Sequence, residues 1–87
     1  MKIIFTKHAL DKFAVLKRLG WKISKLGIKR TIQNPRWVGV SKHGEKTAIS
    51  LVGKNHILRI VFNIEDDIIK IITFHVARRG RYESTLR

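Results

Sequence analysis

The chain has no cysteine, a single proline and few acidic residues. Without cysteine there is no disulfide framework, no thiolate metal site and no cysteine nucleophile. One proline and no Gly/Ser-rich linker give no sign of a domain boundary, so we expect residues 1–87 to form one small domain. No segment approaches the roughly 20 apolar residues that cross a bilayer, and none has the form of a signal peptide. We therefore expect a cytoplasmic protein without membrane attachment.

Positive charge dominates the sequence. Lys and Arg number 19 against 6 Asp and Glu, which gives a formal net charge of +13. Self-repulsion of this size destabilises a compact chain, so the surplus indicates a polyanionic partner such as RNA, DNA or an acidic protein. The alternative is a lysine-rich surface that only keeps the protein in solution. A hydrophobic content of 44% excludes a disordered basic tail, because such a chain has enough apolar surface to fold.

The first third of the chain has helical periodicity. A short β-prone segment, Ile3–Phe5, precedes Thr6, whose side-chain oxygen is a suitable N-cap for a helix over Lys7–Arg18. A second helix is predicted to begin at a Ser24 cap and to end at Asn34, because the proline that follows disfavours helical backbone.

After the proline, apolar residues alternate with polar ones, which is typical of β-strands. Four strands are predicted, at Trp37–Val40, Thr47–Val52, Leu58–Ile64 and Ile68–Ala77. Short turns between these strands require antiparallel pairing. The element order β-α-α-β-β-β-β therefore predicts an α+β fold in which two N-terminal helices pack on one face of an antiparallel sheet. The other face is expected to be at least partly exposed.

The last hairpin is compatible with two registers. If 65–67 form a three-residue loop, Arg59 and His75 share a face of the sheet and lie diagonally within reach of each other. If the loop has two residues, Glu65 faces Ile68, and Arg59 and His75 lie on opposite faces. Apolar residues occupy both faces of the last strand, so periodicity favours neither register.

The residues that carry chemistry are basic and aromatic. No pair of histidines has the short spacing of metal ligands and no Gly-rich phosphate loop is present, so we expect no metal and no cofactor. RNA can be cleaved by its own 2′-hydroxyl, given a proton acceptor, a proton donor and a group that stabilises charge on phosphate. His75 is the candidate acid or base. Arg59 and Arg81 are candidate phosphate stabilisers, and Tyr82 is a candidate proton donor or stacking group.

Other basic residues are expected to contact nucleic acid. They are Arg78, Arg79, Lys7, His8 and Lys70. Trp21 and Trp37 flank the second helix and are expected to pack in the core or at its rim. Because the same basic residues would serve passive phosphate binding, two functions stay open. One is a metal-free endoribonuclease, and the other is a non-catalytic module that binds nucleic acid or protein.

Several short segments resemble a group of small prokaryotic domains related to the RelE and BrnT toxins. They are the His-Ala motif of Phe5–Phe13, the helix end Ile32–Pro35, the hairpin start Gly44–Ala48, the paired strands Leu58–Phe62 and Ile68–Thr73, and the basic ending Ala77–Glu83. The resemblance implies a RelE-like fold and a toxin of a type II toxin–antitoxin system. Such toxins cleave mRNA without metal, often on the ribosome, and an acidic antitoxin neutralises them.

The same resemblance places His75 where the BrnT pattern has an arginine. It also places Arg78, Arg79, Arg81 and Tyr82 in the terminal basic cluster of that pattern. The ending here is shorter than in BrnT and lacks its run of arginines.

Overall fold

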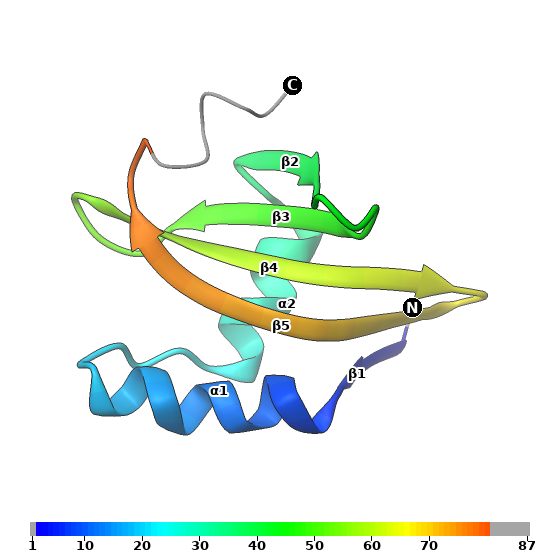
Figure 1. Ribbon diagram of the computed structural model, residues 1–87, viewed down its shortest axis with the longest axis horizontal. Helices are drawn as coiled ribbons and strands as arrows, with labels where there is room; N and C mark the ends of the chain where they lie inside the picture. The colour runs from blue at the N-terminus through cyan, green and yellow to red at the C-terminus, as the bar shows by residue number, and fades with distance from the viewer. Residues whose placement is uncertain (1, 81–87) are drawn as a thin grey trace.

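The computed structural model describes residues 2–80 of the chain. Along these residues two helices and five strands follow one another in the order β1-α1-α2-β2-β3-β4-β5 (Figure 1). Their bounds are β1 Lys2–Phe5, α1 Lys7–Arg18, α2 Lys25–Gln33, β2 Trp37–Val40, β3 Lys46–Leu51, β4 His56–Glu65 and β5 Ile68–Arg78. The α+β class and the element order predicted from the sequence are confirmed. Neither described helix is long and apolar enough to span a membrane.

The strands form one sheet in the order β1-β5-β4-β3-β2. Strands β2 to β5 make the antiparallel meander that short turns require. Strand β1 adds to the far edge and runs parallel to β5, with Phe5 opposite Ile71. The sheet is therefore mixed rather than wholly antiparallel. This pairing joins the two ends of the described chain, so no local pattern in the sequence indicates it.

Thr6 begins α1 and ties the helix to the sheet. Its Oγ1 accepts a hydrogen bond from the backbone N–H of Ala9 at 3.1 Å and donates one to the carbonyl of Ile72 at 2.9 Å. Its own N–H donates to the carbonyl of Ile71 at 3.1 Å. Ser24 caps α2, because its Oγ accepts a hydrogen bond from the backbone N–H of Gly27 at 2.9 Å. Both predicted N-caps are confirmed.

Replacing Thr6 by Val is expected to lower the free energy of unfolding by about 2 kcal/mol, because the N-cap and the bond to the sheet each contribute roughly 1 kcal/mol. Thr6→Ser keeps the hydroxyl and is the matched control, with an expected loss of less than about 1 kcal/mol. Urea denaturation followed by circular dichroism measures both. Equal losses for the two variants would mean that the hydroxyl holds neither the helix nor the sheet.

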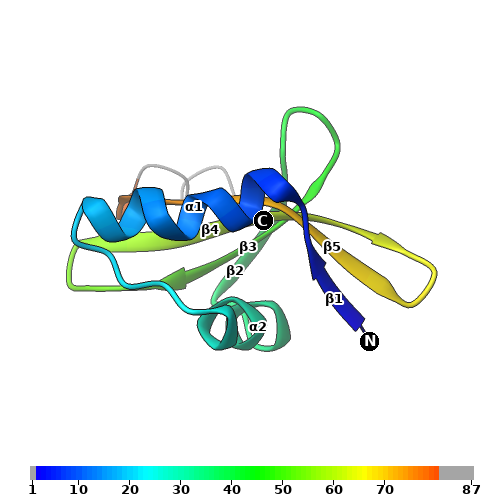
Figure 2. The ribbon, with the colours of Figure 1, turned by 90° about the horizontal axis from the view of Figure 1, so that it is seen from below.

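The main core lies between the helices and one face of the sheet. Phe74, Ile60 and Ile28 are fully buried there. Phe13 of α1 packs on Phe74 with 4.8 Å between ring centroids. Trp21 packs against the same core, so its predicted packing role is confirmed. Figure 2 shows α2 on one side of the sheet and the loop between β2 and β3 on the other.

A second, smaller apolar cluster lies on the face of the sheet opposite the helices, which we call the helix-free face. It contains Ile49, Ile57 and Ala77, with Trp37 packed against it. Side chains alternate along each strand, so these residues point away from the main core that their neighbours fill. The helix-free face is therefore partly apolar, and Trp37 also packs as predicted.

Candidate nucleic-acid interface

The turn between β4 and β5 has two residues, 66 and 67, and Glu65 lies opposite Ile68. Asp66 takes the left-handed conformation there, with φ of 55°. Asp tolerates this conformation in tight turns because its short side chain bonds locally. The structure thus has the shorter of the two loops that the sequence allows.

A β-bulge in β5 then changes the register. Between Val61 and Phe62 the pairing shifts by one position, so Ile72 is an extra residue of β5. Beyond the bulge Arg59 lies directly opposite His75. Directly opposed residues share a face of the sheet. The expectation that a two-residue turn separates these side chains was therefore wrong, because it did not include the bulge.

The bulge is held by the start of α1. The carbonyl of Ile72 accepts the hydrogen bond from the hydroxyl of Thr6, and the carbonyl of Ile71 accepts one from its N–H. A bulge leaves its extra residue outside the regular ladder, so its carbonyl needs another partner. The N-cap of a helix on one face of the sheet thus supports the register of the strand that carries His75.

Pairing extends across the sheet as a row of residues on the helix-free face. Trp37 lies opposite Ile49, Ile49 opposite Arg59, and Arg59 opposite His75. Neighbouring strands lie about 4.8 Å apart, so the backbone of Trp37 lies roughly 10 Å from that of Arg59. The guanidinium of Arg36 lies 5.1 Å from the centre of the Trp37 ring. The helix-free face therefore carries, in one row across the strands, the Trp37 ring with Arg36 over it, then Arg59, then His75.

A groove of about 460 Å³ opens beside this row, between the β2–β3 loop and strands β4 and β5. Arg59 and Thr73 line it from the strands, and Lys42, His43 and Glu45 line it from the loop. Figure 2 shows this loop projecting from the sheet on the side away from α2. The loop brings a second histidine and a lysine beside Arg59. Sequence reasoning missed both, since His43 and the glycine after it indicated only a turn.

Ser41 determines the shape of this loop. Its hydroxyl accepts hydrogen bonds from the N–H groups of His43 and Glu45, both at 3.2 Å, and donates to the carboxylate of Glu45 at 3.0 Å. Its own N–H donates to the carbonyl of Glu45 at 2.7 Å, and Gly44 takes a positive φ of 85°. These bonds hold His43 at the groove while its side chain is exposed.

Of the predicted catalytic residues, the structure brings Arg59 and His75 together. Both are half-buried, and the Nε2 atom of His75 is buried. Partial burial strengthens the electrostatic interactions of an arginine with an anion, because water screens them less. Arg81 and Tyr82 lie outside the described residues.

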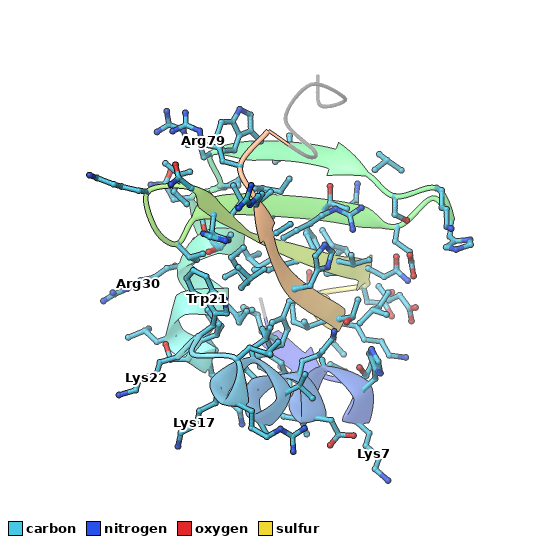
Figure 3. All side chains as sticks on the ribbon, turned by 60° about the vertical axis from the view of Figure 1, so that its left-hand side comes forward. Lys7, Lys17, Trp21, Lys22, Arg30 and Arg79 are labelled. Atoms are coloured by element: carbon cyan, nitrogen blue, oxygen red, sulfur yellow. The ribbon has the colours of Figure 1, made fainter. Side chains whose placement is uncertain are left out.

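The other predicted contacts do not gather at this groove. Lys70 shares the helix-free face but lies toward the β4–β5 turn. Arg78 ends β5, and Arg79 follows it at the other end of the strand. Lys7 and His8 form the first turn of α1, and Figure 3 shows Lys7 and Arg79 at opposite ends of the molecule. The cations of the described chain are thus spread over several surfaces.

Among residues 2–80, no group of three His, Asp or Glu is placed to hold a metal ion. Comparison with family models, with curated proteins and with solved structures finds no match for the chain.

Proposed function

We propose that this protein is a metal-free endoribonuclease that binds single-stranded RNA across its helix-free face. The observation that best supports the proposal is the direct pairing of Arg59 with His75 beside the groove under the β2–β3 loop. A phosphate-binding fork and an acid–base group stand next to each other there. The net charge of +13 supports an RNA partner, because most of the affinity for nucleic acid comes from neutralised phosphates.

The proposed reaction uses the nucleophile of the substrate. The 2′-oxygen attacks the neighbouring phosphorus, and the bond from phosphorus to the 5′-oxygen breaks. His75, through Nδ1 because its Nε2 is buried, and His43 share the two proton transfers, from the 2′-hydroxyl and to the 5′-oxygen. Arg59 binds the non-bridging phosphate oxygens, where negative charge increases in the transition state. The products are a 2′,3′-cyclic phosphate and a 5′-hydroxyl, so the protons balance and no metal takes part.

Trp37 supports single-stranded rather than duplex RNA as the substrate. Unpaired bases stack on aromatic side chains, and each stacked base contributes about 1–3 kcal/mol. Trp37 lies in the same row as Arg59 and His75 and is only half-buried. A base that takes the place of the Arg36 guanidinium on this ring, together with a phosphate on Arg59, would orient the strand across the sheet. The predicted roles of Arg81 and Tyr82 stay part of this proposal.

The proposal also includes a small acidic antitoxin in the cytoplasm, as the resemblance to RelE and BrnT toxins implies. Strand β2 is an edge of the sheet, and its Val38 and Val40 are 51% and 69% exposed. An edge strand with exposed apolar side chains is a template for an added strand. An acidic segment of the antitoxin would add as a strand at this edge and neutralise part of the positive charge of the enzyme.

In the decisive experiment, the purified chain is incubated with single-stranded RNA in the presence of EDTA, and the ends of the RNA products are analysed. We expect a 2′,3′-cyclic phosphate, and no cleavage of the same oligonucleotide made with 2′-deoxyribose. Arg59→Ala should lower the cleavage rate by about 10²–10³, as for other groups that stabilise developing charge. Arg18→Ala, an exposed arginine at the end of α1, is the matched control and should cleave normally.

Filter binding at several salt concentrations accompanies the gel. RNA that is bound in a salt-dependent manner and recovered intact would contradict the proposal, and would favour the non-catalytic nucleic-acid-binding module instead.

A further inference from the structure

A second groove, of about 520 Å³, lies on the helix side of the sheet, between α2, the connection that precedes it and the end of β3. Its volume is within the roughly 300–1,000 Å³ typical of ligand pockets. The exposed Lys22 and Arg30 line it, and so does the buried side chain of Leu58. Figure 3 shows Lys22 and Arg30 on the same side of the molecule, with Lys17 beyond them.

The charges around this groove have one sign. Among the described residues that line it, two are cationic and none is acidic. Lysine and arginine in this setting bind anions, and a guanidinium offers two parallel donors to phosphate oxygens. The groove therefore favours an anionic ligand.

The hydrogen bonds in the groove wall have a defined direction. The Oγ1 of Thr31 lies 3.0 Å from the carbonyl oxygen of Gly27 and 2.8 Å from the Oγ of Ser50. A carbonyl only accepts, so Thr31 uses its one proton on Gly27, and Ser50 must donate to Thr31. The hydroxyl of Ser50 then has only lone pairs free, so it can accept a hydrogen bond from a ligand but has no proton to donate.

The remaining walls are of mixed character. The carboxamides of Gln33 and Asn34 offer both donors and acceptors. The half-buried Ile23 and Val52 also line the groove and contribute an apolar surface. A free phosphate ion has no apolar face for Ile23 and Val52. A nucleobase has a flat apolar face and an edge of donors and acceptors, and its nucleotide carries the phosphate.

We propose that this groove binds one ribonucleotide unit, with its phosphate on Lys22 and Arg30 and its base against Ile23, Val52 and the polar wall. An N–H of the base donates to Ser50. The inference rests on the proposed function in one respect, because RNA is taken as the source of the nucleotide. The groove and the Arg59–His75 pair lie on opposite faces of the sheet, so the groove holds RNA outside the cleavage site.

The test is an amide NMR titration of the full chain with nucleoside 5′-monophosphates and, separately, with inorganic phosphate. We expect saturable shifts at Thr31, Gln33 and Ser50 with nucleotides, and much weaker binding of phosphate. Arg30→Gln should weaken nucleotide binding about tenfold, as expected for a lost hydrogen bond to a charged group. Lys29→Gln is the matched control, since Lys29 is exposed on the same helix and does not line the groove.

Ser50→Ala distinguishes base recognition from simple charge attraction. This variant should weaken nucleotide binding and leave the weak phosphate binding unchanged. Equal losses for Arg30→Gln and Lys29→Gln would overturn the proposal, because they would show diffuse attraction to a basic surface. Phosphate binding as strong as nucleotide binding, or no saturable shifts, would overturn it as well.

A short RNA titrated into the His75→Ala variant, which is not expected to cleave it, identifies the source of the nucleotide. The same shifts at Thr31 and Ser50 would support RNA. Mononucleotide shifts without RNA shifts would overturn RNA as the ligand and leave a free nucleotide. The titration measures binding alone, so failure of the cleavage experiment and failure of this groove are separate results.

Discussion

His75→Ala is expected to reduce the rate of RNA cleavage by about 10²–10⁴, the usual contribution of a general acid or base. RNA affinity should change little, because phosphate contacts spread over many cations contribute most of it. The structural reason is that His75 lies opposite Arg59, so its imidazole stands next to the guanidinium that we propose binds the reacting phosphate. Rates at saturating RNA, measured on labelled oligonucleotides, separate the chemical step from binding.

Two further variants make this prediction specific. His75→Gln keeps a polar side chain of similar length but cannot exchange a proton, so it should lose as much activity as His75→Ala. His8→Ala removes an exposed histidine from the first turn of α1 and should keep most of the cleavage rate. The pH–rate profile should lose one of its limbs in His75→Gln. Normal cleavage by folded His75→Gln would exclude His75 from proton transfer.

Local features of the fold follow from local patterns in the sequence. Thr6 and Ser24 act as N-caps because each comes directly before a helical pattern and places an oxygen near N–H groups that no helical carbonyl reaches. The meander of β2 to β5 follows from alternating residues and short turns. The pairing of β1 with β5 joins segments distant in the chain, and only the packed structure selects it.

The candidate site was harder to predict because it depends on the bulge. Ile69 and Ile71 fill the main core before the bulge, and Phe74 and Val76 do so after it. Residues that face the core are two positions apart in a regular strand, but Ile71 and Phe74 are three positions apart because of the bulge. This spacing explains why apolar residues seemed to occupy both faces of the strand. The partner that holds the bulge, Thr6, lies far away in the sequence.

The sequence also did not predict where the charged side chains lie on the folded molecule. The run of basic residues after β5 indicated one cluster at the end of the chain. In the structure, Lys22 and Arg30 line a groove on the helix side, while Lys42 and Arg59 line the other groove across the sheet. Loops and helices that are separate in the sequence supply these cations, so topology decides which of them meet.

Phe74→Ala is expected to lower the free energy of unfolding by about 3–5 kcal/mol, the usual cost of removing a buried aromatic ring. Phe74 is 0% exposed, lies opposite Ile60 and packs on Phe13. Phe74→Leu is the matched control and should cost less than about 1.5 kcal/mol if the core repacks. Urea denaturation measures both losses. A loss under about 1 kcal/mol for Phe74→Ala would contradict its place at the centre of the core.

Phe74 also connects stability with the proposed activity. Consecutive residues of a strand face opposite sides, so burial of Phe74 in the main core directs its neighbour His75 to the helix-free face. A small domain has only about 5–15 kcal/mol of stability, so Phe74→Ala should be partly unfolded and lose activity in proportion. An excluded osmolyte such as trimethylamine N-oxide favours the folded state and should restore that activity. His75→Ala should stay inactive in the same osmolyte, because it is expected to lack the proton-transfer group and not the fold.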